Sequence, residues 1–258
     1  MVVQYLGIPG VSGRMSYFNV TKDKWHSLLD ISRKDIPEKL IIEGHPDFPG
    51  CIERRRTRLS NVRPAWMPNL IIGDFQGQSI GYGVCFGGPL VSQFVHIYCK
   101  LGTQKIIQIG TGGGLQKDLE LGDIVVSESV LSLDGVWKLY RQRSRRLMFD
   151  DGLRDRAAHE LEKNHANFRV GRTVSYYDIL LEEEKDLHKL SESGYLGVEM
   201  EAAATASVAS FFGVPAIALF VVSDNSITGK DLFYSQTEEE RKRIKKSRDT
   251  VFDVALEI

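Results

Sequence analysis

Cysteine is scarce in this 258-residue sequence, and signals for export or membrane insertion are missing. The three cysteines, Cys51, Cys85 and Cys99, are widely spaced and form no CxxC pair, which favours reduced, buried thiols over a disulfide framework. The longest strongly apolar run, about Val214 to Val222, is far shorter than the roughly 20 residues that span a bilayer. The first ten residues lack the basic segment, apolar core and cleavage site of a secretory signal. We therefore expect a cytoplasmic protein that does not enter a membrane.

An excess of charge of one sign is also absent. The sequence holds 33 Lys and Arg residues against 34 Asp and Glu residues, a formal net charge of −1, so we expect no nucleic-acid partner. The six histidines show no metal-ligand spacing with cysteines or acids, and no G-x-S-x-G elbow occurs. We therefore expect neither a metal site nor a serine hydrolase.

The chain length suits one α/β domain. No internal repeat, low-complexity tract or Pro/Gly/Ser-rich linker divides it. Residues 1–35 are interpreted as an N-terminal extension packed on a main domain of residues 36–258. Within that domain short strands alternate with helices, which predicts a mixed sheet enclosed by helices.

Short sequence patterns predict individual helices and strands. A short turn containing Gly77 predicts a hairpin between strands at 69–75 and 79–85. Thr237 and Glu240 form a capping box, which predicts a helix over 237–256. Further strands are expected at 105–109, 123–129, 168–175 and 216–222, and further helices at 22–32, 51–59, 90–101, 155–163 and 202–212.

A glycine-rich stretch, Gly110 to Gly114, follows the strand at 105–109. It is predicted to form a turn whose free N–H groups receive an anion, because small residues let another molecule approach the backbone closely. The dinucleotide fingerprint is not met, since Leu115 stands where G-x-G-x-x-G needs its last glycine, and no Walker lysine follows. The alternative is a tight turn that needs glycine for its geometry alone.

Two further stretches carry acids beside apolar segments. Glu199 and Glu201 flank Met200 just before the alanine-rich helix, where a charge costs free energy unless it binds something. A carboxylate there can accept two hydrogen bonds from a vicinal diol. Asp224 follows a buried strand, where α/β folds bind ligands, and a partly desolvated carboxyl can act as a general acid. The alternatives are exposed acids at a helix start and, for Asp224, a cap or turn role.

Four motif segments follow one another along the chain. They are Phe86 to Pro89, Ile109 to Gly113 with Gly122-Asp123 after it, Gly197 to Ala203, and Val222 to Asp224. In order and spacing, the chain from Lys39 onward resembles the nucleoside phosphorylase family, which includes hexameric purine nucleoside phosphorylase and uridine phosphorylase. The resemblance implies a mixed sheet that forms a distorted barrel surrounded by helices, in homodimers or hexamers built from dimers. It also implies purine salvage: cleavage of a nucleoside by inorganic phosphate, a co-substrate, to free base and pentose 1-phosphate, with no cofactor.

The resemblance assigns roles at the sugar and base ends of the site. Glu201 holds the ribose hydroxyls, and Met200 lies against the apolar face of the sugar. Asp224 donates a proton to purine N7, with Arg241 as its supporting arginine, and an aspartate at this position favours purines. The other residues implied in substrate binding are Glu199, Val198, the backbone of Gly113, and the pair Tyr176 and Tyr177, which stacks on base and sugar.

The phosphate end departs from the family pattern. The family's loop reads G-D-P-x-R, and Gly44 to Phe48 stands in its place, with phenylalanine at the arginine position. Gln108 replaces a second arginine, and an uncharged glutamine cannot substitute for a bidentate guanidinium. Two features are retained: Gly110 with the hydroxyl of Thr111, and Arg63, which matches an arginine that reaches in from a neighbouring subunit. The segment Pro9 to Arg14 is a second-ranked source of a cation.

Three functions remain open at this point. The first is a phosphorylase acting on a purine-like nucleoside. The second is a nucleosidase of the same fold that uses water, which the loss of two arginines favours, with Glu43, His45 or Asp47 activating the water. The third is a non-catalytic nucleoside-binding protein, against which the retained Glu201 and Asp224 argue.

Overall fold

A closed barrel of five strands forms the centre of the molecule. The computed structural model describes residues 20–258. The barrel strands are β5 (Lys105–Gly114), β6 (Ile124–Ser132), β8 (Phe168–Ser175), β9 (Gly197–Glu199) and β10 (Ala216–Asp224). They pair in the closed order β10–β6–β8–β9–β5–β10. The pairs β5–β10, β6–β8 and β8–β9 are parallel, whereas β6–β10 and β5–β9 are antiparallel.

The sheet continues beyond the barrel from β5. The added strands, in sheet order, are β1 (Lys39–Gly44), β4 (Gln78–Cys85), β3 (Leu70–Phe75) and β2 (Ser60–Pro64), and β7 (Arg146–Met148) pairs with β6. β3 and β4 form the predicted hairpin. Its two turn residues, Gln76 and Gly77, both have positive φ, as two-residue hairpin turns that match the strand twist require.

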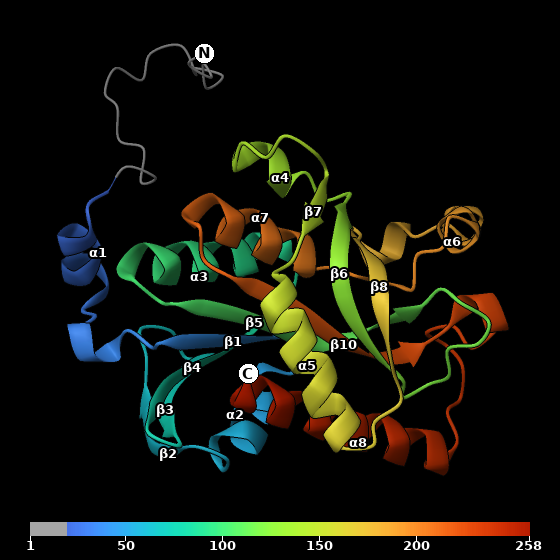
Figure 1. The fold of residues 1–258 in the computed structure, drawn as a ribbon, viewed down its shortest axis with the longest axis horizontal. Helices are drawn as coiled ribbons and strands as arrows, with labels where there is room; N and C mark the ends of the chain where they lie inside the picture. The colour runs from blue at the N-terminus through green and yellow to red at the C-terminus, as the bar shows by residue number, and fades with distance from the viewer. Residues whose placement is uncertain (1–19) are drawn as a thin grey trace.

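Helices enclose the sheet (Figure 1). α3 (Gly88–Leu101) packs on α7 (Ala202–Phe212) on one side, and α2 (Phe48–Arg56), α5 (Asp151–Lys163) and α8 (Glu238–Glu257) cover the other. α1 (Lys22–Leu29) lies against α3 at the edge of the molecule. The short elements are α4 (Val136–Leu139), α6 (Glu184–Glu192) and the 3-10 turns η2 (Arg33–Asp35), η3 (Ile179–Leu181) and η4 (Ser226–Thr228).

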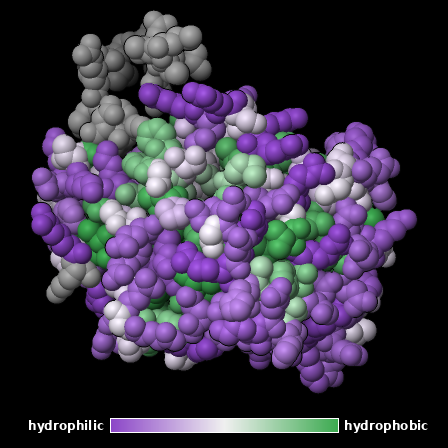
Figure 2. Space-filling model, viewed as in Figure 1, coloured by the Kyte–Doolittle hydropathy of each residue, from purple (hydrophilic) through white to green (hydrophobic). Residues whose placement is uncertain are grey.

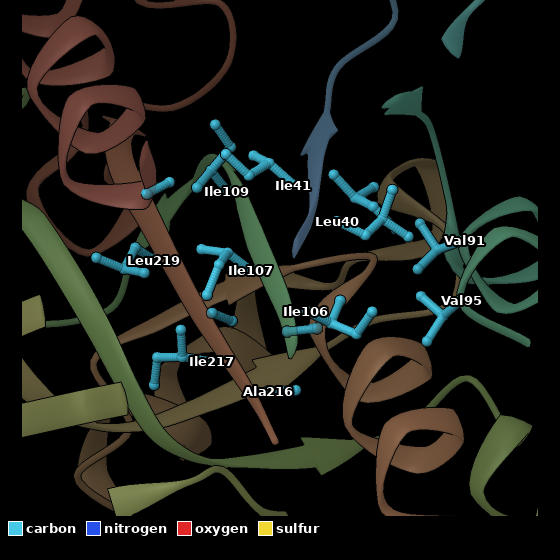
Figure 3. Close-up of a cluster of buried hydrophobic side chains, with 14 of the residues drawn as sticks. Leu40, Ile41, Val91, Val95, Ile106, Ile107, Ile109, Ala216, Ile217 and Leu219 are labelled. Carbon is cyan, nitrogen blue, oxygen red and sulfur yellow. The ribbon is translucent and has the colours of Figure 1, made fainter. Parts of the chain in front are cut away.

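The core fills both faces of β5 (Figure 3). Ile106 lies on the side of Val91 and Val95 of α3, whereas Ile107 and its ladder partner Ile217 lie on the opposite face, because side chains alternate along a strand. Strands covered on both faces carry nearly continuous apolar runs. This explains why β5 and β10 were recognisable in the sequence as strands.

The predicted fold class is confirmed: one α/β domain with a mixed sheet closed into a barrel and surrounded by helices. β8 and α7 have the predicted bounds, and Thr237 caps α8 through the predicted capping box. The predicted glycine turn is wrong. β5 runs on to Gly114, pairing with β10 and β9, and no glycine from Gly110 to Gly114 has a positive φ.

The structure describes only part of the expected N-terminal extension. Residues 20–35 carry α1 and η2, and the boundary at residue 35 stays a prediction. The segment Pro9 to Arg14 lies outside the described residues. The face of the molecule shown in Figure 2 is mostly hydrophilic, with apolar side chains in separate patches. From residue 20 onward, no helix has both the length and the apolar character needed to cross a membrane.

Candidate active site

A cavity of about 310 Å³ opens where the parallel strands β1, β5 and β10 end. The predicted site residues that line it are Gly44, Thr111, Gly113, Val198, Glu199, Met200, Glu201 and Asp224. The other lining residues are His45, Pro46, Phe86, Gly112, Ile179, Glu182, Ser223 and Leu232. Glu201 and Asp224 therefore share one cavity, as the sequence predicted.

Strand register places three of the predicted residues side by side. Gly113 of β5 is the ladder partner of Asp224 on β10 and of Val198 on β9. The register shifts between Val222 and Asp224, and such bulges commonly re-aim a side chain beside a functional site. Closure of the barrel is thus what brings segments distant in sequence to the same cavity wall.

Glycine is required along this wall because other groups approach the backbone closely. A Cβ at Gly112 would lie 2.6 Å from the backbone oxygen of Val198, and one at Gly113 would lie 3.0 Å from Oδ2 of Asp224. A Cβ at Gly44 would lie 2.7 Å from Oε2 of Glu201. The glycines therefore form crowded strand ends that admit the two acids, rather than the predicted turn. The anion binding expected of them stays a prediction.

Glu199 is engaged by its own chain at the start of α7. Its Oε2 accepts the backbone N–H groups of Glu201 (2.7 Å) and Ala202 (2.6 Å), and its Oε1 accepts the hydroxyl of Ser175. Burial raises the pKa of Glu199, and the negative charge of Glu201 adds to this effect, although the hydrogen bonds favour the charged form. Glu199 thereby fixes the junction of β9 with α7 and positions Glu201.

Glu201 is the N-cap residue of α7 and is only 5% exposed. Its Oε1 accepts the backbone N–H of Gly87 at 2.6 Å, and its Oε2 lies beside Gly44 at the cavity wall. Burial raises the pKa of Glu201, while hydrogen bonds from the backbone of Gly87 and Met200 oppose the rise. Two carboxylate oxygens offer about four acceptor sites, so this side chain keeps capacity for the hydroxyls of a ligand.

Asp224 ends β10 with its carboxyl partly buried at the cavity. Burial raises its pKa, although the hydroxyl of Ser223 donates to Oδ1 at 2.8 Å and favours the charged form. The cap role that the sequence left open belongs to the next residue, since the side chain of Asn225 accepts the N–H of Ile227 at the start of η4. Asp224 is therefore a desolvated carboxyl that can hold and deliver a proton.

Glu182 is a cavity residue that the sequence analysis missed. It follows η3 in the loop before α6 and lines the cavity together with Asp224. Burial raises the pKa of Glu182 to about 7, and the charge of Asp224 contributes. The sequence shows a run of three acids at 182–184, a signal that does not tell which of them faces inward.

The end of the cavity that was predicted to bind phosphate carries an imidazole where cations were expected. Thr111 and Gly44 line it as predicted, with His45 beside them. Nδ1 of His45 accepts the backbone N–H of Asp47 at 3.0 Å, so the proton of the neutral ring lies on Nε2. Burial lowers the pKa of His45, which favours the neutral ring. Phe48, at the expected arginine position, begins α2 and packs against the core.

Three other residues predicted at the phosphate end are not among those lining the cavity. Gln108 is 3% exposed, and its Oε1 accepts the hydroxyl of Thr205 on α7 at 2.9 Å, which gives it a packing role beneath the cavity. Gly110 lies within the β1–β5 ladder. Arg63 on β2 pairs with Asp35 at 2.9 Å, outside the cavity of its own chain.

Arg241 and the predicted aromatic pair also lie elsewhere. Arg241 lines a separate hollow between α2 and α8 with other cationic side chains, so the structure does not bring it together with Asp224. Tyr176 and Tyr177 stack on each other, with 4.8 Å between ring centroids. Tyr176 is buried and Tyr177 is exposed, and neither is among the cavity-lining residues.

Two of the three candidate water activators are engaged away from the cavity. Glu43 is 2% exposed and pairs with Arg248 (2.7 Å) and Arg55 (3.3 Å). Burial opposes ionisation of Glu43, but the two arginines hold its pKa below the usual range. Asp47 caps α2 by accepting the N–H of Gly50. This leaves His45, which does line the cavity.

The charged groups in the cavity wall are of one sign. Four carboxyl groups line it, from Glu182, Glu199, Glu201 and Asp224, and no lysine or arginine is among the described lining residues. Nowhere in residues 20–258 are three or more His, Cys, Asp or Glu side chains grouped so that they could hold a metal ion. Burial raises the pKa of each of these four carboxyls. A wall of hydrogen-bond acceptors with no cation suits an uncharged ligand rich in hydroxyls and amines.

The fold and the cavity define an α/β barrel protein with a small-molecule site at the carboxyl ends of its parallel strands. A model of the Phosphorylase superfamily matches residues 75–258. A DeoD-type purine nucleoside phosphorylase of Latilactobacillus sakei is 29% identical over 245 residues, which cover 89% of this chain and 97% of that protein. The corresponding protein of Alkaliphilus metalliredigens is 30% identical over 173 residues, 66% of this chain and 72% of that one.

The solved structure of a uridine phosphorylase from Vibrio fischeri matches with a TM-score of 0.77 at 20% identity, covering 89% of this chain and 94% of that chain. The chain belongs to the Phosphorylase superfamily and is an enzyme of the nucleoside phosphorylase type. The family resemblance seen in the sequence is confirmed.

Proposed function

We propose that this enzyme cleaves the N-glycosidic bond of a purine-like nucleoside with inorganic phosphate, giving free base and pentose 1-phosphate. The observation that carries the proposal is the placement of Glu201 and Asp224 in one cavity whose volume is within the usual range for small-ligand sites. The purine preference is supported by the acid at position 224 and by relatives named as purine nucleoside phosphorylases.

The geometry supports a separate role for each of the residues that contact the sugar and the base. The Glu201 carboxylate accepts the ribose hydroxyls, and Met200 covers the apolar face of the sugar. Asp224 delivers its proton to N7 of the base as the glycosidic bond breaks, so the base leaves without negative charge. The sugar then carries oxocarbenium-like positive charge, which the neighbouring carboxylates stabilise, and the nucleophile attacks from the end at Thr111 and His45.

The co-substrate needs positive charge that the described cavity wall does not supply. We propose that Arg63 of a second copy provides it in a homodimer or in a hexamer of dimers. No cofactor is proposed beyond phosphate as co-substrate. We place the enzyme in the cytoplasm, where the buried free thiols of Cys51, Cys85 and Cys99 stay reduced, with a role in purine salvage.

A hydrolytic nucleosidase is the second candidate, and the absence of lysine and arginine from the described cavity wall favours it. In this reaction water takes the place of phosphate, next to the neutral imidazole of His45. The chemistry at Glu201 and Asp224 is unchanged, because only the nucleophile differs.

One assay separates these functions. Purified protein is incubated with adenosine, inosine, guanosine and uridine, with and without phosphate, and free base is measured by liquid chromatography. Release of purine base only with phosphate supports the phosphorylase, and equal release without phosphate supports the nucleosidase. Binding of a nucleoside without release of base identifies a non-catalytic relative, and release from uridine alone overturns the purine assignment.

A further inference from the structure

A second hollow, of about 400 Å³, lies between α2 and α8. It is separate from the active-site cavity, because none of the described residues lines both. The two sites are nevertheless neighbours: Nε2 of Gln236, which lines the hollow, donates to the backbone oxygen of Ser223, which lines the cavity, at 2.9 Å. The described cations that line the hollow are Arg54, Arg55, Arg241, Lys245 and Arg248.

These cations outnumber the acids that pair with them. The ion pairs are those of Glu43 with Arg55 (3.3 Å) and Arg248 (2.7 Å), of Asp249 with Arg55 (2.6 Å), and of Asp47 with Arg54 (3.5 Å). Three acids thus face five cations, so within residues 20–258 the hollow carries an excess of two positive charges.

Arg241 and Lys245 are the two hollow cations that have no acid partner. Both are exposed, and neither side chain forms a hydrogen bond or ion pair with the described part of the chain. They are four residues apart on α8, a spacing at which like charges repel. Lys242, on another face of the same helix, pairs with Glu238 at 2.6 Å. The face of α8 that lines the hollow therefore keeps positive charge that nothing in residues 20–258 neutralises.

The other guanidinium groups of the hollow are held in place by the protein. Arg55 is buried and donates to the backbone oxygen of Arg248 at 3.0 Å, which joins α2 to α8. Arg54 and Arg248 both approach Sγ of Cys51, at 3.0 and 3.6 Å. Burial raises the pKa of this thiol, so a neutral group lies between two like charges. The side chains of Arg54 and Arg248 are 44% and 20% exposed, so both keep donors for a ligand.

This arrangement matches the chemistry of phosphate groups. Guanidinium groups bind phosphate oxygens through two parallel hydrogen bonds, and these bonds are strengthened by charge. The cations of α8 extend from Arg241 to Arg248, or about 10 Å along the helix axis at 1.5 Å per residue. One phosphate ion is too short to contact all of them, whereas a chain of phosphate groups can do so and also balances the excess charge.

We propose that the hollow between α2 and α8 binds a polyphosphate, a chain of two or three phosphate groups that is either free or part of a nucleotide. Arg54, Arg241, Lys245 and Arg248 contact the phosphate oxygens in this scheme. The inference goes beyond the proposed function and does not depend on it, because it concerns residues outside the active-site cavity.

The test measures binding of tripolyphosphate by calorimetry to the wild type and to two double variants. Arg54→Gln/Lys245→Gln removes two cations of the hollow, and Lys242→Gln/Lys246→Gln removes the same charge from α8 outside it. All four residues are exposed, so both variants should fold. Loss of two charge-assisted contacts predicts binding about 10- to 100-fold weaker in the first variant and within about twofold of the wild type in the second. No binding to the wild type, or equal weakening in both variants, would overturn the inference.

Two further ligands define what the hollow recognises. Inorganic phosphate should bind at least about tenfold more weakly than tripolyphosphate, since it reaches fewer cations, and equal affinity would contradict a polyphosphate site. Tighter binding of ATP than of tripolyphosphate would identify a nucleotide as the ligand, and equal or weaker binding would identify a free polyphosphate.

A crystal structure of the wild type with tripolyphosphate needs no variant. The inference predicts phosphate oxygens within hydrogen-bond distance of Arg241 and Lys245. Tripolyphosphate bound in the active-site cavity, with the hollow empty, would contradict it.

Discussion

Replacing Glu201 by glutamine should slow nucleoside cleavage while leaving the fold intact. The glutamine oxygen can still accept the N–H of Gly87, which now bonds to Oε1 at 2.6 Å. The other oxygen, beside Gly44, is replaced by an NH₂ group of similar size. The vicinal diol of the ribose then meets a donor where it had a charged acceptor.

The size of the loss follows from the kind of hydrogen bond removed. A hydrogen bond to a charged group contributes about 1.5–3 kcal/mol, roughly twice as much as a neutral one. Weakening two such bonds by half costs about 1.5–3 kcal/mol in the transition state, or about 10- to 100-fold in kcat/KM. We expect a loss near the larger value, because Glu201 is almost fully buried.

The assay is a cycle that changes both the protein and the substrate. Adenosine and its 2′-deoxy and 3′-deoxy analogues are compared in the wild type and in Glu201→Gln, with free base as the readout. In the wild type, loss of a hydroxyl should reduce kcat/KM, and in the variant the same loss should matter less, because the partner is already weakened. Equal penalties in both proteins would show that Glu201 does not contact the sugar.

Stability provides the control for this variant. The pKa of Glu201 is raised in the folded state, so the native protein binds more protons than the unfolded chain between the usual and the raised pKa. Wild-type stability therefore falls as pH rises through that window. Glutamine does not titrate, so the variant should be at least as stable as the wild type at pH 8, as measured by urea denaturation.

Three other changes test separate parts of the structure. Asp224→Asn should lower kcat for purine nucleosides about 10²- to 10⁴-fold with little change in nucleoside Kd, measured by steady-state kinetics and calorimetry; unchanged turnover would exclude it as the acid. Gly112→Ala places a Cβ 2.6 Å from the Val198 oxygen and should lower the free energy of unfolding by about 1–3 kcal/mol in urea, whereas an unchanged midpoint would refute the crowding. Burial lowers the pKa of Lys39 from 10.5 to about 7, so wild-type stability should rise between these pH values relative to Lys39→Met; parallel profiles would contradict this.

Features decided by short-range physics could be predicted from the sequence. The side chains of Thr237 and Glu240 each accept a hydrogen bond from the other's backbone N–H within one turn. The start of α8 could therefore be predicted from the sequence. The turn at Gly77 joins two strands that pair directly with each other. The apolar runs of β5 and β10 reflect burial on both faces, which requires no knowledge of their partners.

Features that depend on residues distant in the sequence could not be predicted from the sequence. The glycines at the end of β5 have the same composition as a turn, and only the approach of Val198 and Asp224 shows that they belong to a crowded strand. Gln108 was predicted at the phosphate end from its sequence position, and the sequence did not show that its amide oxygen accepts the hydroxyl of Thr205 on α7. Glu182 is indistinguishable in sequence from Glu183, and tertiary burial alone separates them.

The central claim is that Glu201 and Asp224 hold the two ends of one nucleoside. A crystal structure with a carbon-linked adenosine analogue, which the enzyme cannot cleave, tests this most directly. The account predicts the ribose hydroxyls within hydrogen-bond distance of Glu201 and the N7 position of the base within hydrogen-bond distance of Asp224. An analogue bound outside this cavity, or bound with its base against Glu201, would contradict it.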